Sequence, residues 1–430
     1  MDNFTAIVLA AGKGERMKSS LPKVLHTLED KPLLWHVLTQ LKQVKQIQQI
    51  LVVTGYQAAK VEAYVKENAG AQKSRKIEFC RQKKLLGTGD AVRCALSKVK
   101  YDNVLVLCGD APLITADTLQ SFLVFHQQQA SFCSLISASM PADNDLGKII
   151  RDPLGNVQAI REKVDLDTLV THRRDSLKEV NSGIYAFDKD KLQQNLAKIQ
   201  KNPKKDEYFL TDLIEIFYDQ AANIAAYALK DSNEIYGINT KRDLINAAKI
   251  MRQRTIYSLI EQGVTIIDPD STYIASGTQI GQNTVIFPFT FIEKNVIIGS
   301  SCSLGPFLHL REGTILEDNS QLGNFVEVVR STIGKDVRAK HHAYIGDTTI
   351  AGSVNVGAGT IIANYDGKHK NKTVIEKGAF IGSNSVLIAP VRIGANAITG
   401  AGSVVTKNVP ARTTVVGVPA KVFIKKRKKI

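Results

Sequence analysis

Residues 274–328, IASGTQIGQNTVIFPFTFIEKNVIIGSSCSLGPFLHLREGTILEDNSQLGNFVEV, carry an aliphatic side chain at every sixth position. A helix repeats about every 3.6 residues and a half-buried strand every two, so neither produces a strict period of six. A parallel β-helix does, because each six-residue unit forms one short strand and one turn, and three units close a coil. The aliphatic positions are Ile274, Ile280, Ile286, Ile292, Ile298, Leu304, Leu310, Leu316, Leu322 and Val328.

The six-residue repeat continues beyond Val328 with shifts of register. The aliphatic positions resume at Ile333, Ile350 and Ile375, and the third series runs on to Val405. The segment between Ile362 and Ile375 is too polar for the inside of a coil. We therefore predict a loop that projects from the β-helix there, where solenoids often bind ligands, although a plain surface insertion is the alternative reading.

The composition is that of a soluble globular protein. The 430 residues are 44% hydrophobic and 23% charged, and they suffice for two or three domains. Five cysteines without metal-ligand spacing suggest free thiols in a reducing compartment, and no apolar run is long enough to span a membrane. We expect a cytoplasmic protein. The net charge of +15 favours anionic small substrates or a solvated basic surface, since no nucleic-acid motif accompanies it.

The first two-fifths of the chain alternate strand and helix patterns. Short apolar runs at 6–10, 50–54 and 104–107 read as buried strands, and 33–41 and 58–65 as helices. This alternation predicts an α/β fold with a mostly parallel sheet, whose ligands bind beyond the carboxyl ends of the strands.

Two segments follow strands at that edge and carry the chemistry of a nucleotide site. Gly12 and Gly14 allow backbone amides to approach a phosphate, and Lys23 adds positive charge. Asp110 ends the strand 104–107, where its carboxylate could hold Mg2+. A tight turn with a helix cap is the alternative for the glycine segment, which matches neither the P-loop nor the full dinucleotide fingerprint.

The segment Leu9-Ala-Ala-Gly-Lys-Gly-Glu-Arg-Met17, followed by Leu21-Pro-Lys23, resembles the signature of sugar-nucleotide pyrophosphorylases. With the β-helix behind it, nearly the whole chain resembles the bifunctional N-acetylglucosamine-1-phosphate uridyltransferase/glucosamine-1-phosphate acetyltransferases. This resemblance implies an α/β Rossmann-like nucleotidyltransferase domain followed by a left-handed parallel β-helix of hexapeptide repeats. We place the domains at 1–240 and 264–424, a connecting helix at 241–263 and a basic tail at 425–430.

The family resemblance implies the synthesis of UDP-N-acetylglucosamine for the cell envelope, namely for peptidoglycan and lipopolysaccharide. In the uridyltransferase half, Lys23 and Arg16 would neutralise phosphates during catalysis, and Asp110 and Asn239 would bind Mg2+. The positions that match UTP and UDP-sugar contacts are Leu9, Ala10, Gly12, Lys23, Gln82, Gly87, Thr88, Gly147, Glu162 and Asn181.

In the acetyltransferase half, the resemblance implies that His341 is the general base. Arg311, Tyr344 and Asn355 match contacts to glucosamine 1-phosphate. The positions that match the acetyl-CoA site are Ala358, Asn364, Tyr365, Ser383 and Ala401. The family also implies a homotrimer with acetyl sites shared between subunits. Without the resemblance, His341 and His342 read as a surface pair, of which one side chain faces a given cleft.

Three positions depart from the family pattern. Val329 stands where the family usually has a lysine that contacts the sugar phosphate, with Arg330 next to it. The late arginine near the coenzyme phosphates has no counterpart in 416–419, VGVP, and Cys108 replaces a larger residue.

These departures keep two alternatives open. The β-helix could serve only as a trimerisation scaffold behind a working uridyltransferase, which Val329 favours. The chain could also be a binding or assembly protein without catalytic activity, with RNA on its basic tail; the clustered glycines, Lys23, Asp110 and Asn239 argue against this.

Overall fold

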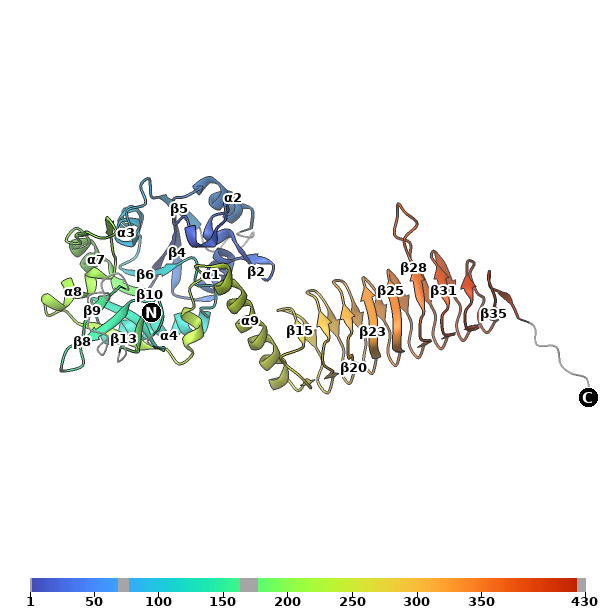
Figure 1. Cartoon of the computed structure of the whole chain (residues 1–430). Coiled ribbons are helices and arrows are strands. Elements are labelled where there is room, and N and C mark those ends of the chain that lie inside the picture. Colours follow the sequence, from blue (N-terminus) through green and yellow to red (C-terminus); the bar gives the residue numbers. More distant parts are fainter. Residues whose placement is uncertain (1, 69–76, 142, 163–176, 424–430) are drawn as a thin grey trace, which may run out of the picture. The chain divides into compact units, whose positions relative to one another are not determined.

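A computed structural model describes residues 2–68, 77–141, 143–162 and 177–423 (Figure 1). The chain divides into two compact units, Met1–Ala248 and Lys249–Ile430. The predicted tail at 425–430 lies outside the described residues. Among the helices of the described residues, none is both long and apolar enough to cross a membrane.

The first unit is built on a nine-stranded sheet with the strand order β13-β7-β10-β6-β1-β4-β5, and β8 and β9 are attached beside β10. The strands β6, β1, β4 and β5 are mutually parallel, while β10 runs antiparallel to β6 and β7. The strands of this sheet are β1 (Phe4–Ala10), β4 (Ile47–Thr54), β5 (Ile77–Arg81), β6 (Asn103–Cys108), β7 (Cys133–Ser139), β8 (Lys148–Arg151), β9 (Val157–Arg161), β10 (Glu179–Asp188) and β13 (Ile224–Ala228).

Helices pack on both faces of the sheet (Figure 1). Along β1, Ala6 and Val8 join one buried cluster and Ile7 joins the other, as the alternation of side chains along a strand requires. The α/β prediction is therefore confirmed. The α-helices are α1 (Leu33–Gln43), α2 (Ala58–Asn68), α3 (Thr88–Leu96), α4 (Ala116–Gln129), α7 (Lys189–Leu196) and α8 (Asp212–Asp219). The minor elements are η1 (Glu15–Met17), η2 (Lys23–Leu25), η3 (Ser232–Ile235), β2 (Thr27–Leu28), β3 (Lys31–Pro32), β11 (Lys201–Asn202) and β12 (Glu207–Tyr208).

The helix α9 (Lys241–Glu261) matches the long helix that the sequence predicts. The division between the two units falls within it, after Ala248. Its C-terminal half packs on the second unit, because Ile256 and Leu259 belong to the core of the repeat region.

Apart from the C-terminal half of α9 and one antiparallel pair at its end, the second unit consists of parallel strands stacked in three columns. Each predicted inward position pairs with its equivalent one coil later, as Ile274 with Ile292 and Ile292 with Leu310. These side chains are fully buried, so one continuous aliphatic stack forms the core. The unit is the parallel-strand hexapeptide region that the period of six predicts.

Most strands of the repeat unit have two or three residues, and the two longer ones, β23 and β25, have nine each. The strands are β14 (Thr265–Ile266), β15 (Tyr273–Ile274), β16 (Gln279–Ile280), β17 (Val285–Ile286), β18 (Phe291–Ile292), β19 (Ile297–Ile298), β20 (Ser303–Leu304), β21 (His309–Leu310), β22 (Ile315–Leu316), β23 (Gln321–Val329), β24 (Thr332–Ile333), β25 (Arg338–Gly346), β26 (Thr348–Ile350), β27 (Asn355–Val356), β28 (Ile361–Ala363), β29 (Thr373–Ile375), β30 (Phe380–Ile381), β31 (Val386–Ile388), β32 (Val391–Ile393), β33 (Ile398–Thr399), β34 (Val404–Val405), β35 (Thr414–Val416) and β36 (Lys421–Val422).

The shifts of register have a structural cause. Leu322 pairs with Ala339 and Val328 with Ile345, so these coils contain 17 residues, one fewer than the coil from Ile292 to Leu310. The polar segment between β28 and β29 projects from the repeat unit as the predicted loop (Figure 1).

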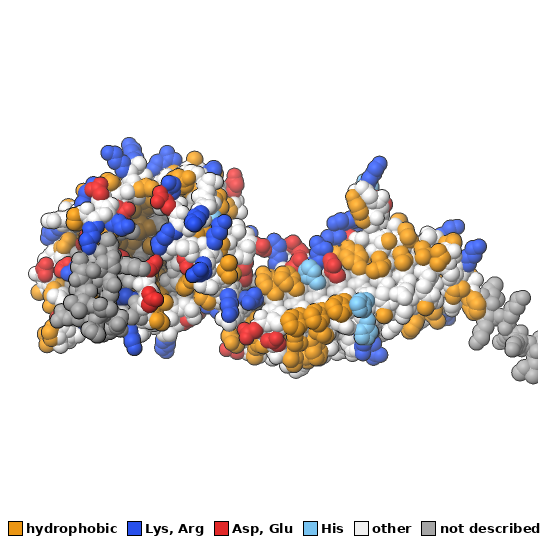
Figure 2. All heavy atoms as spheres, viewed as in Figure 1, with side chains coloured by type: hydrophobic (Ala, Val, Ile, Leu, Met, Phe, Trp, Pro, Cys, Tyr) orange, Lys and Arg blue, Asp and Glu red, His pale blue; other side chains and the backbone are white. Residues whose placement is uncertain are grey.

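A stack of exposed aromatic rings marks one corner of the repeat unit. Phe289, Phe307, Phe325 and His342 all have positive φ, and neighbouring ring centroids lie 4.9–5.2 Å apart. Figure 2 shows that hydrophobic side chains gather in patches on the surface of this unit. In later coils the equivalent corner positions are Gly359, Asn384 and Gly402, so the aromatic stack ends at His342.

Candidate active sites

Strand pairing brings the two predicted strand-end segments of the first unit together. Leu9 of β1 pairs with Cys108 of β6, and the Gly109 amide donates to the Leu9 carbonyl at 2.9 Å. The Ile238 amide donates to the Asp110 carbonyl at 2.9 Å, which places Asn239 at the same edge. Residues far apart in the chain thus meet at the carboxyl ends of parallel strands, where α/β proteins bind ligands.

Lys23 links the two predicted metal ligands. Its ammonium group forms an ion pair with the Asp110 carboxylate and donates to Asn239 Oδ1 at 3.1 Å. Gly14 makes room for Lys23, because a Cβ at residue 14 would lie 2.5 Å from the Lys23 Cβ. Asp243 in the first turn of α9 holds Asn239, since it accepts from the backbone amides of Asn239 and Thr240 at 3.0 and 2.7 Å.

The donor set of this cluster fits a magnesium ion. A carboxylate and an amide oxygen converge on one cationic group, and both are oxygen ligands of the kind Mg2+ accepts. No group of three or more His, Cys, Asp or Glu that could hold a metal occurs within the part of the chain that the structure describes. Two protein oxygens suit Mg2+, which usually keeps several waters and binds substrate phosphates.

A cavity of about 230 Å³ opens beside this cluster. It gathers predicted site residues that lie far apart in the sequence of the first unit. Those on its wall are Leu9, Thr88, Asp110, Gly147, Glu162, Asn181 and Asn239. The Asn181 amide group donates to the Tyr185 hydroxyl at 2.7 Å, and a Cβ at residue 147 would lie 3.3 Å from Glu162 Oε1. Gly147 therefore permits the close approach of Glu162.

Other predicted residues lie away from the cavity wall. Arg16 reaches only its rim, through an ion pair at 3.4 Å with Asp145, which lines the cavity. The Gln82 amide nitrogen donates to the Gly87 carbonyl at 3.1 Å and to Asp90 at 2.9 Å, so it holds the segment before α3. Gly12 lies in open space, and Ala10 is buried at the end of β1.

Thr211 is a candidate binding residue that the sequence analysis missed. It lines the cavity and is 7% exposed, and its buried Oγ1 has no hydrogen-bond partner among the described residues. A buried hydroxyl normally finds a partner, so this one suits a hydroxyl or amide of a substrate. The residues around Thr211 show only the pattern of an amphipathic helix, so sequence patterns alone assign Thr211 no role.

Cys108 also lines the cavity, and the high pKa of its thiol disfavours the reactive thiolate. Burial raises its pKa to about 12, and the neighbouring Asp110 carboxylate acts in the same direction. The thiolate is the reactive form of cysteine, so Cys108 contributes size and shape to the cavity.

In the repeat unit, the two neighbouring histidines have different surroundings. His341 Nδ1 lies 2.9 Å from Asn324 Oδ1 on the preceding coil. An amide oxygen only accepts, so Nδ1 donates and Nε2 is left as the basic nitrogen. His342 instead stacks on Phe325 at the corner. The structure thus separates the two side chains as the alternation along a strand predicts.

His341 heads a column of small side chains. The register pairs Ala339 with Val356, Val356 with Ile381 and Ile381 with Thr399. The residues two positions later, His341, Ala358, Ser383 and Ala401, therefore occupy equivalent places on successive coils. This column runs beside the corner where the aromatic stack has ended.

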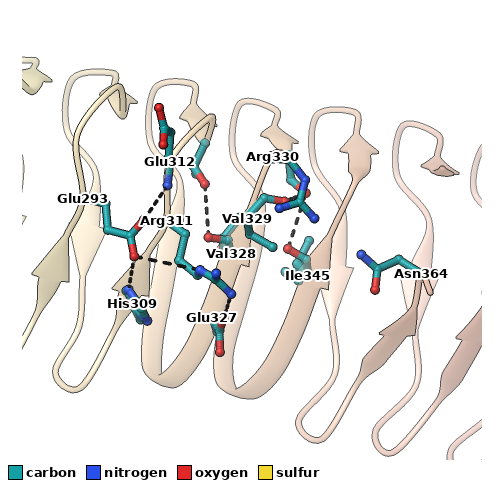
Figure 3. A network of polar contacts seen from close by, with 12 residues as sticks. Glu293, His309, Arg311, Glu312, Glu327, Val328, Val329, Arg330, Ile345 and Asn364 are labelled. Atoms are coloured by element: carbon teal, nitrogen blue, oxygen red, sulfur yellow. Dashed lines mark hydrogen bonds and ion pairs between the residues drawn. The ribbon is translucent and has the colours of Figure 1, made fainter. Parts of the chain in front are cut away.

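A second group of predicted residues lies on the next face of the repeat unit. Arg311 donates to Glu327 at 2.9 Å and lies 3.9 Å from Glu293, which also contacts His309 (Figure 3). Tyr344 pairs with Glu327 of the preceding coil in the strand register.

Asn364 belongs to the same group as Tyr344. A Cβ at residue 346 would lie 2.6 Å from Asn364 Nδ2 and 2.9 Å from the Tyr344 hydroxyl, so glycine leaves room for both. Asn355 lies on the other face, in the strand column of Arg338 and Phe380.

At the two positions where the family has a cation that contacts phosphate, both within the described residues, this chain has none that is free to do so. Val329 is buried. Arg330 forms a bidentate ion pair with Asp347, and Val418 is exposed near the end of the described chain. In the projecting loop, Tyr365 pairs with Lys370 in a β-bridge, and its hydroxyl donates to the Gly367 carbonyl at 2.7 Å.

Together, the α/β unit with its strand-end site and the hexapeptide unit define a two-domain transferase. Residues 5–252 match the nucleotidyl transferase family, residues 290–326 the hexapeptide repeat of succinyl-transferase, and residues 372–407 the bacterial transferase hexapeptide.

Relatives that match nearly the full length of the chain identify the family within this class. The chain is 38% identical to the bifunctional protein GlmU of Heliobacterium modesticaldum, over 96% of this chain and 94% of the relative. It is 41% identical to the same protein of Lactococcus lactis subsp. lactis, over 96% and 95% respectively. The chain belongs to the bifunctional GlmU family and combines nucleotidyltransferase with hexapeptide acetyltransferase activity.

Proposed function

We propose that this chain makes UDP-N-acetylglucosamine in two steps, acetylation of glucosamine 1-phosphate followed by uridylyl transfer from UTP. The observation that carries the proposal is the contact of Lys23 with Asp110 and Asn239 beside a cavity lined by Glu162 and Asn181. A cation and two oxygen ligands suit phosphates and their metal, and polar side chains on a small cavity suit a sugar.

In the uridylyl step, a phosphate oxygen of N-acetylglucosamine 1-phosphate attacks the α-phosphorus of UTP, and pyrophosphate leaves. The attacking oxygen is already an anion, so the site needs no general base. Lys23 binds and orients the phosphates and offsets their charge, with Arg16 at the rim. Asp110 and Asn239 would hold Mg2+, which supplies further positive charge to the phosphates when bound.

The sugar end of this site gives a direct test at Thr211. We expect Thr211→Val to lower kcat/KM for N-acetylglucosamine 1-phosphate about 3- to 10-fold, the value of one neutral hydrogen bond. Valine preserves the shape and removes a hydroxyl that has no partner among the residues the structure describes, so the melting temperature should not fall. The readout is pyrophosphate release at varied sugar phosphate.

Thr373→Val is the matched control, because Thr373 is also buried, with an Oγ1 that lacks a partner within the described part of the chain, but lies in the repeat unit. It should leave uridylyl transfer unchanged. A Thr211→Val enzyme with wild-type kcat/KM would contradict the assignment of this hydroxyl to the sugar.

In the acetyl step, His341 Nε2 takes a proton from the sugar amine as the nitrogen attacks the thioester carbonyl of acetyl-CoA. The new amide bond forms as the carbon–sulfur bond breaks, and the coenzyme leaves as its thiol. The Asn324 contact keeps the proton on Nδ1 and so keeps Nε2 basic. The small side chains at Ala358, Ser383 and Ala401 leave room beside His341 for the thin pantetheine arm.

We further propose a homotrimer that works in the cytoplasm, with acetyl sites shared between subunits. His341 and Asn355 lie on one face of the repeat unit and Arg311 and Tyr344 on the next, so a neighbouring copy could unite the two groups. The exposed aromatic corner offers apolar surface for such packing. Light scattering that gives a monomer at assay concentrations would contradict this proposal.

A second candidate function is uridylyl transfer alone, with the repeat unit as a scaffold. The buried Val329 favours this second candidate, because it stands where the family has a lysine that contacts the sugar phosphate. The two candidates differ in one measurement, the release of coenzyme thiol in the presence of glucosamine 1-phosphate.

A further inference from the structure

Arg330 is the cation nearest in sequence to the missing lysine at position 329, but its guanidinium group is already engaged. Its Nε donates to Asp347 Oδ1 at 2.7 Å and its Nη2 donates to Asp347 Oδ2 at 2.8 Å. Such bidentate pairs are among the stronger charge-assisted contacts and fix orientation as well as charge. The Asp347 side chain is 13% exposed, so the pair is partly shielded from solvent.

Asp347 also forms hydrogen bonds with residues at the ends of the projecting loop, and so links Arg330 to that loop. Asn364 Nδ2 donates to Asp347 Oδ2 at 2.5 Å, and Asn364 itself is buried. The Asn371 amide donates to the Asn364 carbonyl at 2.7 Å, and the Thr373 amide to the Asp347 carbonyl at 3.3 Å. Both ends of the loop are thereby attached to the coil that carries Asp347.

The position of Asn364 depends on this attachment. Its amide group lies over Gly346 next to the Tyr344 hydroxyl, where a rotation of the side chain would remove it from the group of Arg311 and Tyr344. Figure 3 shows Arg330 and Asn364 on successive parts of the repeat, with Ile345 between them. The Arg330 hydrogen bond is also the main reason that the pKa of Asp347 is lowered, so Asp347 stays an ionised acceptor at neutral pH.

We propose that Arg330 is a positioning residue for acetyl transfer, which holds Asn364 and the loop 364–372 in the acetyl-CoA site through Asp347. It does not replace the missing lysine as a phosphate ligand. The proposal rests on the acetyl-transfer function proposed above, and on the register that places residues 330, 347 and 364 each 17 apart.

The test is a double-mutant cycle on the full chain, read as thiol release from acetyl-CoA with glucosamine 1-phosphate. We expect Arg330→Ala to lower kcat/KM for acetyl-CoA about 10-fold or more, in the range for lost charged hydrogen bonds. The double variant Arg330→Ala/Asn364→Ala should have the same kcat/KM for acetyl-CoA as Asn364→Ala alone, because Arg330 acts only through Asn364. KM for glucosamine 1-phosphate should rise no more in Arg330→Ala than in Asn364→Ala, because Arg330 acts on that substrate only through Asn364.

Arg392→Ala is the matched control. Arg392 forms an ion pair with Glu376 from one coil to the next, with the Nε contact at 2.6 Å, and the hydrogen bonds of both residues go to residues outside the loop 364–372. This variant should keep wild-type kinetics. Losses that multiply in the double variant, or a KM for the sugar phosphate that rises in Arg330→Ala but not in Asn364→Ala, would overturn the positioning role and make Arg330 a phosphate ligand.

A second readout does not depend on activity. Lys368 and Lys370 are exposed in the loop, and trypsin cleaves such sites at a rate set by local opening. We expect Arg330→Ala and Asn364→Ala to speed cleavage there, while Arg392→Ala does not. If wild type released no thiol, the acetyl-transfer proposal would fail while this comparison still tested the link. Cleavage of Arg330→Ala at the wild-type rate would overturn that link.

Discussion

Asp110→Ala is expected to abolish Mg2+-dependent pyrophosphate release, with a loss of at least about 1,000-fold in kcat. The change removes the carboxylate that contacts Lys23 and is the only charged member of the proposed metal-ligand pair. Electrostatic groups aimed at a phosphoryl transition state typically contribute losses of this size. The measurement is pyrophosphate formed from UTP and N-acetylglucosamine 1-phosphate at saturating Mg2+, with metal affinity followed by equilibrium dialysis.

Two comparisons make this result specific. Asp190→Ala changes an exposed aspartate in the first turn of α7 and should keep full activity. Acetyl transfer should survive in Asp110→Ala, because the other step uses the repeat unit. Full pyrophosphate release by Asp110→Ala would show that the metal assignment is wrong.

His341→Ala is expected to lower acetyl transfer about 100- to 10,000-fold, the usual contribution of a general base. Uridylyl transfer from ready-made N-acetylglucosamine 1-phosphate should be unchanged. The assay is thiol release from acetyl-CoA with glucosamine 1-phosphate as acceptor.

His342→Ala is the matched control, since it removes the adjacent imidazole, which stacks on Phe325, and leaves the contact of His341 with Asn324 in place. It should retain most of the acetyl transfer. Equal losses in the two variants would mean that the strand as a whole is sensitive, and would remove the reason to single out His341.

The repeat fold could be predicted from the sequence because each inward position is set by one requirement, an aliphatic side chain every sixth residue. The coil shortened by one residue could be seen only as a shift in that pattern, and its pairing, Leu322 with Ala339, needed the structure. The projecting loop followed from polarity, because charged residues such as Asp366 cannot be buried in a coil without partners.

The candidate sites were predictable where local rules apply. Asp110 follows a buried strand, which places it at the ligand-binding edge of the sheet. Asn239 could be predicted only from the family resemblance. It lies far from Asp110 in the sequence, and the backbone hydrogen bond from the Ile238 amide to the Asp110 carbonyl brings the two residues together.

Residues whose role depends on contacts between coils or with a helix cap were missed. Asn324 orients His341 from the coil before, and Arg330 meets Asp347 one coil later, which sequence spacing reveals only after the register is known. Thr211 precedes α8, where its hydroxyl could have capped the helix but instead lines the cavity. Gln82 is predicted to contact UTP, and its amide nitrogen also donates to the Gly87 carbonyl and to Asp90, a contact that sequence spacing does not reveal.

The central claim is that one chain carries both transfers despite the loss of a cation at Val329. Its most direct test is thiol release by the wild-type protein from acetyl-CoA and glucosamine 1-phosphate, beside pyrophosphate release from UTP and N-acetylglucosamine 1-phosphate. We predict that both products form at rates well above a blank without enzyme. Pyrophosphate release without any thiol release would contradict the claim and leave the repeat unit as a scaffold.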